Sequence, residues 1–199
     1  MLNDYKLSKQ RQFEIFGSEI DLSIESTITE DIQHTKDSIL NWRDQIYRYQ
    51  RELITYPQNI SKQETFTTNN DNYLHKINPF LLKANSINFW RSNKPIHKGS
   101  AMYFVLDSIK EKQIILYIGE TFAADKRWKG EHDCKRYVSN YKESLSHNKL
   151  VSKIDIRFFL DVPKDVKLRR KLEKKLIYMW LPPFNKETRD RWSTTFTYN

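Results

Sequence analysis

The sequence predicts an α/β fold in which a small, mostly antiparallel three-stranded sheet is flanked by helices and preceded by a mainly helical arm. Two β-rich runs at 101–107 and 112–119, joined by a short polar link, predict a hairpin. An alternating run at 153–160 predicts the third strand. The chain of 199 residues is long enough for one domain with an appended arm. We therefore expect the arm over residues 1–98 and the α/β domain over 99–199.

The arm is predicted to contain one long helix. Thr27 and Glu30 have the spacing of a capping box, in which both side chains bind amides of the first turn. Apolar residues then recur every seven positions, at Ile32, Ile39, Ile46 and Leu53. A dimeric coiled coil and a helix packed on its own domain share this pattern, and its short length favours the packed helix.

Two more helices are predicted, one before and one after the third strand in the sequence. A charged, aromatic-rich stretch from 123 to 146 predicts the first of them. Asp161 and Pro163 are placed as the N-cap and first-turn proline of the second, which should end at Leu181 before two prolines. The apolar stripe of this last helix is Leu168, Leu172, Leu176 and Trp180.

Composition and charge limit the classes of partner and site that this protein can have. The net charge of +9 and the pI near 9.4 favour a polyanionic partner, with nucleic acid first and an anionic membrane surface second. There is no apolar run long enough to span a membrane and no signal peptide, so we expect a cytoplasmic protein without a membrane partner. A single cysteine, Cys134, excludes internal disulfides and cysteine-based zinc clusters, and the five histidines lack ligand spacing.

Two segments before residue 99 have the composition of partner-binding regions. The polar segment 58–72 predicts a loop that a partner orders. The segment 77–99 interleaves aromatic and basic side chains, which suits stacking on bases and neutralising phosphates. Aromatic residues packed in the core beside outward-pointing lysines give the same pattern, so both interpretations stay open. The predicted nucleic-acid contacts are Trp90, Arg91, Lys94 and Lys98, joined by Lys126 after the hairpin.

An ordered set of residues lies between 100 and 185. It consists of Ala101-Met102-Tyr103, Tyr117-Ile118-Gly119, Arg127, Glu173 and the Asn185 of a Leu-Pro-Pro-Phe-Asn run. This set resembles the GIY-YIG nuclease superfamily, which includes excision-repair nucleases, intron homing endonucleases and restriction enzymes. Two positions depart from the family pattern. Ala101 stands where the family usually has glycine, and Glu131 stands where many members have histidine or tyrosine four residues after the arginine.

The resemblance implies a GIY-YIG-like fold and a divalent-metal-dependent endonuclease that hydrolyses DNA phosphodiester bonds. Of Tyr103 and Tyr117, one phenol would take a proton from water and the other would hold water or phosphate, and which does which stays open. The guanidinium of Arg127 can bridge phosphate oxygens. Glu173 would be the single carboxylate ligand of Mg²⁺, for which Mn²⁺ can substitute. Asn185 completes the family's site and is expected to orient the turn or Glu173.

His132 is the remaining candidate for a catalytic side chain. It lies one residue beyond the family's usual position, and an extra turn or bulge would aim it at the site; Tyr137 and Tyr141 are alternatives. Gly119 is expected to let the backbone pass close to the helix that carries the arginine.

The short chain with an N-terminal arm resembles the type II restriction enzymes of this superfamily, whose arm would select the target. We therefore expect double-stranded DNA as the partner and a two-fold homodimer on it. The alternatives are a homing, phage or repair nuclease, and a nucleic-acid-binding module that no longer cleaves. RNA as the substrate also stays open.

Overall fold

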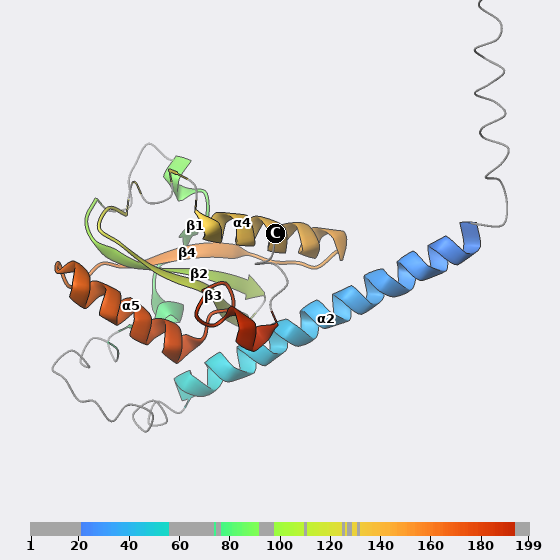
Figure 1. The fold of residues 1–199 in the computed structure, drawn as a ribbon, viewed down its shortest axis with the longest axis horizontal. Coiled ribbons are helices and arrows are strands. Elements are labelled where there is room, and N and C mark those ends of the chain that lie inside the picture. The colour runs from blue at the N-terminus through green and yellow to red at the C-terminus, as the bar shows by residue number, and fades with distance from the viewer. Residues whose placement is uncertain are drawn as a thin grey trace, which may run out of the picture. The chain divides into compact units, whose positions relative to one another are not determined.

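The computed structural model describes residues 21–55, 74, 77–91, 98–109, 111–124, 126, 129–130 and 132–193. The chain divides into two compact units, Met1–Leu40 and Asn41–Asn199. Within the described ranges the α-helices are α2 (Asp21–Thr55), α4 (Asp133–His147) and α5 (Val166–Trp180). The strands are β1 (Asn85–Ser86), β2 (Ala101–Ile109), β3 (Lys112–Thr121) and β4 (Ile154–Phe159), as Figure 1 shows. None of these helices has the length and apolarity that a membrane-spanning segment needs.

The strands form one antiparallel sheet in the order β1-β4-β2-β3. The α/β class and the three predicted strands are confirmed, and the structure adds β1 as a fourth. Two residues with no alternating pattern cannot be recognised as a strand from sequence, because β1 is defined only by its pairing with β4. In the β2–β3 hairpin Tyr103 lies opposite Gly119 and Val105 lies opposite Tyr117, with an irregularity in register after Val105. This register brings both tyrosines to one face.

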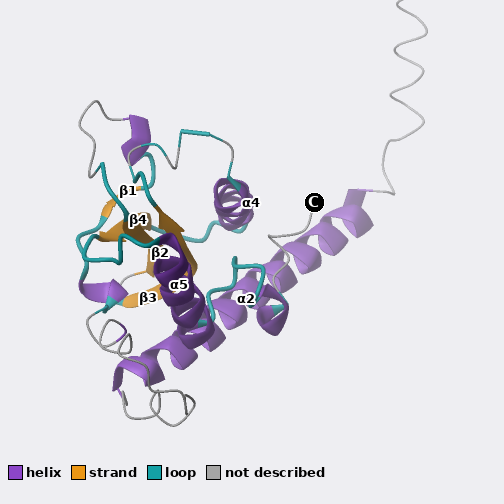
Figure 2. Ribbon diagram, turned by 60° about the vertical axis from the view of Figure 1, so that its left-hand side comes forward, coloured by secondary structure: helices purple, strands orange, loops and turns teal. Residues whose placement is uncertain are grey.

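Helices cover the two faces of the sheet (Figures 1 and 2). α5 lies on one face, where its apolar side chains pack against every second residue of β2. This core contains Met102, Phe104, Leu106, Ile115, Ile118, Leu172, Leu176, Ile177 and Trp180. α4 lies on the other face, where the Tyr141 hydroxyl donates to the Asp107 carboxylate over 2.7 Å. The predicted tyrosine site is therefore on the α4 face.

The predicted start of each of these three helices is wrong. α2 already includes Asp21, so positions 27 and 30 lie inside the helix and not at its start. α4 begins at Asp133 instead of 123, with His132 as its N-cap. Histidine is not among the usual N-cap residues, which explains why the boundary was placed too early.

The last helix also begins later than predicted. Its N-cap is Asp165, which accepts from the Leu168 amide over 2.8 Å, and Asp161 therefore has no capping role. Leu168 is 42% exposed and does not belong to the buried stripe, whereas the neighbouring Arg169 is buried. The predicted end is correct, because Leu181 adopts a left-handed conformation that terminates the helix.

The C-terminal part of α2 belongs to the same unit as the sheet. The Gln50 side chain accepts from the Ile115 amide over 2.7 Å and donates to the Ile115 carbonyl over 3.1 Å. Ile46 is fully buried and Leu53 packs against the core. This part of α2 is thus a packed helix. The structural division falls after Leu40, whereas the sequence predicted a boundary at 98/99.

A buried ion pair ties α2 to β2. The Arg43 guanidinium contacts the Asp107 carboxylate over 2.6 Å, and both side chains are almost fully buried. Asp107 also accepts from Ser152 over 2.7 Å and from the Lys153 amide over 3.2 Å. Burial and the Asp107 carboxylate raise the pKa of Tyr141, which keeps its phenol protonated.

We expect Arg43→Met to destabilise the protein by about 3–5 kcal/mol, because it leaves the Asp107 charge buried without its main partner. Denaturant unfolding measures this loss. Arg48→Met is the matched control, because Arg48 pairs with Asp44 at the exposed surface and should contribute little. Equal stability of the two variants would contradict a structural role for the buried pair.

Candidate active site

Two tyrosines lie side by side on the α4 face of the sheet. The rings of Tyr103 on β2 and Tyr117 on β3 are stacked, with centroids 6.0 Å apart and planes inclined by 22°. Tyr103 is fully buried and Tyr117 is half-buried. Phe158 of β4 supports the Tyr103 ring from the neighbouring strand, with centroids 6.3 Å apart. The core therefore fixes Tyr103, while Tyr117 lies closer to solvent.

His132 joins this pair. Its Nε2 lies 2.8 Å from the Tyr103 hydroxyl oxygen, and its ring meets the Tyr117 ring edge-on with centroids 5.6 Å apart. Its Nδ1 accepts from the Cys134 amide over 3.0 Å and so caps α4. Because Nδ1 is an acceptor, the proton of the neutral ring is on Nε2, and Nε2 must donate to the Tyr103 oxygen. The helix cap thus fixes both the tautomer and the direction of the hydrogen bond.

Gly119 lies beneath the ring of Tyr103. A Cβ atom built on Gly119 would lie 2.8 Å from Cε1 of Tyr103 and closer still to Cζ and the hydroxyl oxygen. The Tyr103 ring therefore lies directly over the Gly119 backbone. The expected contact with a helix carrying the arginine cannot be described, because Arg127 lies outside the described residues.

We expect Gly119→Ala to destabilise the protein by about 1–3 kcal/mol, because the new methyl group must displace a fully buried ring. The displacement should also break the Tyr103–His132 hydrogen bond. Thermal unfolding and the exchange of the hydroxyl-bonded histidine proton by NMR measure the two effects. Gly130→Ala is the control, since a Cβ there meets no atom within 4 Å. Similar behaviour of the two alanine variants would contradict the close packing at Gly119.

Glu173 lies at the outer edge of β3, because α5 presents it there. Its Oε1 accepts from the Glu120 amide over 2.9 Å. The pKa of Glu173 is raised to about 7, first by burial and then by the nearby Glu120 and Glu187 carboxylates. The amide of Glu120 and the charge of Arg170 act in the opposite direction. A carboxylate at this position carries its negative charge at a cost near neutral pH.

These properties fit a divalent cation. Carboxylate oxygens are hard ligands of the kind that Mg²⁺ prefers, and a cation would stabilise the charge that burial penalises at Glu173. No group of three or more histidine, cysteine or acidic side chains with metal-binding spacing occurs among the described residues. The family resemblance implies Glu173 as the protein ligand of such an ion, with water and phosphate oxygens completing the coordination.

β3 is the last strand of the sheet, and side chains form hydrogen bonds with the backbone groups at its outer edge. Asn185 accepts from the Ile118 amide over 2.9 Å and donates to the Ile118 carbonyl over 2.8 Å. Gln50 pairs with Ile115 in the same way, and Glu173 follows at Glu120. Asn185 is buried and fully engaged with the strand, so it positions the edge and does not face a substrate. Covered edges also prevent pairing with other chains.

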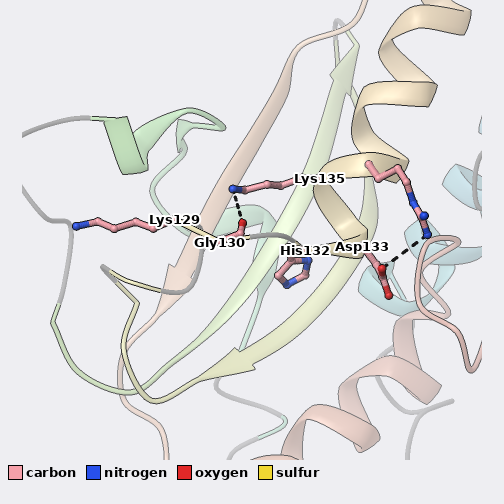
Figure 3. Close-up of a pocket in the computed structure, with 6 residues that line it drawn as sticks. Lys129, Gly130, His132, Asp133 and Lys135 are labelled. Atoms are coloured by element: carbon pink, nitrogen blue, oxygen red, sulfur yellow. Dashed lines mark hydrogen bonds and ion pairs between the residues drawn. The ribbon is translucent and has the colours of Figure 1, made fainter.

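A basic pocket adjoins His132. It has a volume of about 680 Å³ and is lined by Lys129, Gly130, His132, Asp133, Lys135 and Arg136. Lys135 reaches back from the first turn of α4 and donates to the Gly130 carbonyl over 2.8 Å (Figure 3). Burial and the positive charge of Arg91 lower the pKa of Lys135. The pocket lining therefore contains three cations and one carboxylate.

The predicted DNA-contact residues are only partly described. Arg91, Lys98 and Lys126 are exposed. Lys94 lies outside the described residues, as do Arg127, Glu131 and the segment 58–72, and only the backbone of Trp90 is described.

The aromatic residues of the 77–99 segment are core residues where they are described. Phe80 packs edge-on against Trp180, and Phe89 packs edge-on against Phe158. Phe89 is buried and Phe80 is partly buried, so this packing favours the core interpretation for these two side chains.

Sequence reasoning missed the cations of the pocket. Lys129, Lys135 and Arg136 all come from the basic run between 126 and 136, whose density of positive charge was the available signal. The outer face of α5 adds further exposed cations, which are Lys167, Arg170, Lys171 and Lys174. Of the alternatives to His132, Tyr137 and Tyr141 are both buried, and the Tyr141 hydroxyl is bound to Asp107.

The β2–β3 pair and the start of α4 bring Tyr103, Tyr117 and His132 together. Glu173 lies at the outer edge of β3. A scan against protein-family models and searches of curated proteins and solved structures found no match to this chain.

Proposed function

We propose that this protein is a divalent-metal-dependent endonuclease that hydrolyses phosphodiester bonds of double-stranded DNA, with the site organisation of the GIY-YIG superfamily. The observation that carries the proposal is the hydrogen bond between His132 and Tyr103, stacked beside Tyr117. Two phenols and an imidazole that pack against one another form a set of proton-transfer groups, of which Tyr103 is fully buried and Tyr117 is nearer to solvent. A basic pocket next to them matches a polyanionic substrate.

The proton path follows from the tautomer of His132. Nε2–H donates to the Tyr103 oxygen, so negative charge that develops on this oxygen is stabilised. As a phenolate, after its own proton has passed to solvent, Tyr103 would then be the better candidate to take the proton of the attacking water. Tyr117 is half-buried and therefore nearer to solvent than Tyr103, so its phenol is better suited to hold water or a phosphate oxygen.

Charge relief at the phosphate has two sources in this proposal. Glu173 would hold a Mg²⁺ or Mn²⁺ ion, which when bound neutralises charge on the phosphate and the leaving oxygen. The family resemblance assigns Arg127 to the phosphate oxygens as well. Asn185, Gln50 and the Glu120 amide keep the β3 edge and the Glu173 carboxylate in place.

The proposal extends to a sequence-specific type II restriction enzyme, acting as a two-fold dimer. Its support is the chain layout, in which a helical segment precedes a compact α/β unit. A homing, phage or repair nuclease has the same chemistry but a different choice of target.

Incubation of the purified protein with plasmid and phage DNA in Mg²⁺, Mn²⁺ or EDTA tests the proposal. Discrete fragments that require the metal and disappear with Glu173→Gln are expected. Smearing or nicking that requires the metal would keep the nuclease and reject the restriction enzyme. Intact DNA in every metal, together with retained binding, would reject the nuclease in favour of a binding module.

A further inference from the structure

The basic pocket beside His132 has a composition that catalysis does not require. Of its lining residues, His132 contacts the tyrosine pair. The cations Lys129, Lys135 and Arg136 extend the site along the start of α4. We propose that this pocket binds a DNA phosphate that neighbours the scissile phosphate on the same strand. Lys135 and Arg136 would contact this phosphate, and the Asp133 carboxylate would compete with it for the cations. This inference rests on the proposed function, because it takes DNA as the ligand.

Three features support a phosphate as the occupant. The pocket, at about 680 Å³, has the size of a small-ligand site and is large enough for a phosphate with its sugar. Its charge is positive, with three cations against Asp133. The pKa of Lys135 is lowered by burial and by the charge of Arg91, so two cations are crowded together in a way that a bound anion would relieve.

The ion pairs of Asp133 explain how binding is tuned. Its carboxylate lies 3.7 Å from Arg136 and 3.3 Å from Lys186. Both of these cations are exposed, so exchanging the carboxylate for a phosphate costs little free energy. DNA must compete with Asp133 for them. Removal of the Asp133 charge should thus strengthen binding, which is the opposite of the usual effect of a pocket substitution.

The continuity between the pocket and the tyrosine pair favours a neighbouring phosphate over a distant one. His132 belongs to both, with its Nε2 on Tyr103 and its ring in the pocket wall. Successive phosphates of one DNA strand are separated by roughly 3.4 Å along the helix axis. A strand whose scissile phosphate lies at the tyrosines would therefore place another phosphate within reach of the pocket.

The test is the salt dependence of binding to a short fluorescent DNA duplex, measured by anisotropy in EDTA so that no cleavage occurs. Lys135→Met and Arg136→Met should each weaken binding and lower the salt slope by about one. The affinity of each variant should therefore fall about 4-fold less than that of the parent between about 50 and 200 mM salt. Asp133→Asn should tighten binding. Lys142→Met is the control, since Lys142 is exposed on the same helix but does not line the pocket.

A second variant separates charge from loop structure, because Lys135 also holds the Gly130 carbonyl. Lys135→Arg should restore the salt slope that Lys135→Met loses. Affinities and slopes of all pocket variants equal to those of Lys142→Met would overturn the proposal. If the protein cleaves DNA and the pocket variants bind normally, the proposal of a phosphate-binding pocket is rejected and the proposed nuclease function is retained. If the pocket variants behave as expected but no DNA is cut, the proposed nuclease function is rejected and phosphate binding by the pocket is retained.

Discussion

Replacement of Tyr103 by phenylalanine is expected to slow DNA cleavage at least about 100-fold, the usual contribution of a positioned proton-transfer group. The phenyl ring retains the packing against Tyr117 and Phe158, so the fold should be preserved. What is lost is the oxygen that receives the hydrogen bond from His132. Single-turnover cleavage at saturating enzyme measures the effect without a contribution from binding.

His132 provides the matched comparison, because its two nitrogen atoms have separate tasks. Asparagine is a preferred N-cap residue, so His132→Asn should keep α4 capped while removing the contact with Tyr103. His132→Ala should lose both and be about 1 kcal/mol less stable. We expect both variants to cleave slowly, and only the alanine variant to melt earlier. Normal cleavage by His132→Asn would show that the imidazole serves only as a helix cap.

Replacement of Glu173 by glutamine is expected to change the pH dependence of stability as well as activity. The folded-state pKa of about 7 lies above the ordinary value of 4.5. The folded protein therefore binds the proton more tightly than the unfolded chain, and stability falls as pH rises from about 4.5 to 7. Glutamine can still accept from the Glu120 amide but has no charge to bury. We expect Glu173→Gln to be about 2–3 kcal/mol more stable than the parent at pH 8.

Denaturant unfolding at several pH values measures this difference, and it should vanish below the ordinary pKa. Added Mg²⁺ should raise the melting temperature of the parent protein at pH 8 and leave that of Glu173→Gln unchanged, because ligands stabilise only the state that binds them. Glu143→Gln, at an exposed position of α4, is the control for loss of a negative charge. A parallel pH profile for the parent and Glu173→Gln would contradict the raised pKa.

The sequence predicted the elements whose pattern repeats along the chain. Strands β2, β3 and β4 were recognised because long β-rich runs are unambiguous, and the last helix was recognised from Leu172 and Leu176. The missed features depend on partners distant in sequence. β1 exists through pairing with β4, and Arg169 is buried in a position of polar pattern because Glu120 lies 2.6 Å away.

The candidate site shows the same division. The motif residues could be identified from their order, but the distances between them could not. His132 reaches Tyr103 because residue 132 precedes α4 as its cap, so the helical spacing that was assumed for 123–146 does not apply. Gly119 was correctly singled out for a close approach, but the group that approaches it is the Tyr103 ring, which only the strand register reveals.

The most direct test of the central claim is a double-mutant cycle on single-turnover DNA cleavage in Mg²⁺, with Tyr103→Phe, Glu173→Gln and the combined variant. The claim is that the phenol on the α4 face and the carboxylate at the β3 edge act on the same bond. Groups that act as a unit have strongly non-additive effects. We expect the combined variant to cleave about as slowly as the slower single variant. Effects that multiply, or a single variant that cleaves at the parent rate, would contradict a shared site.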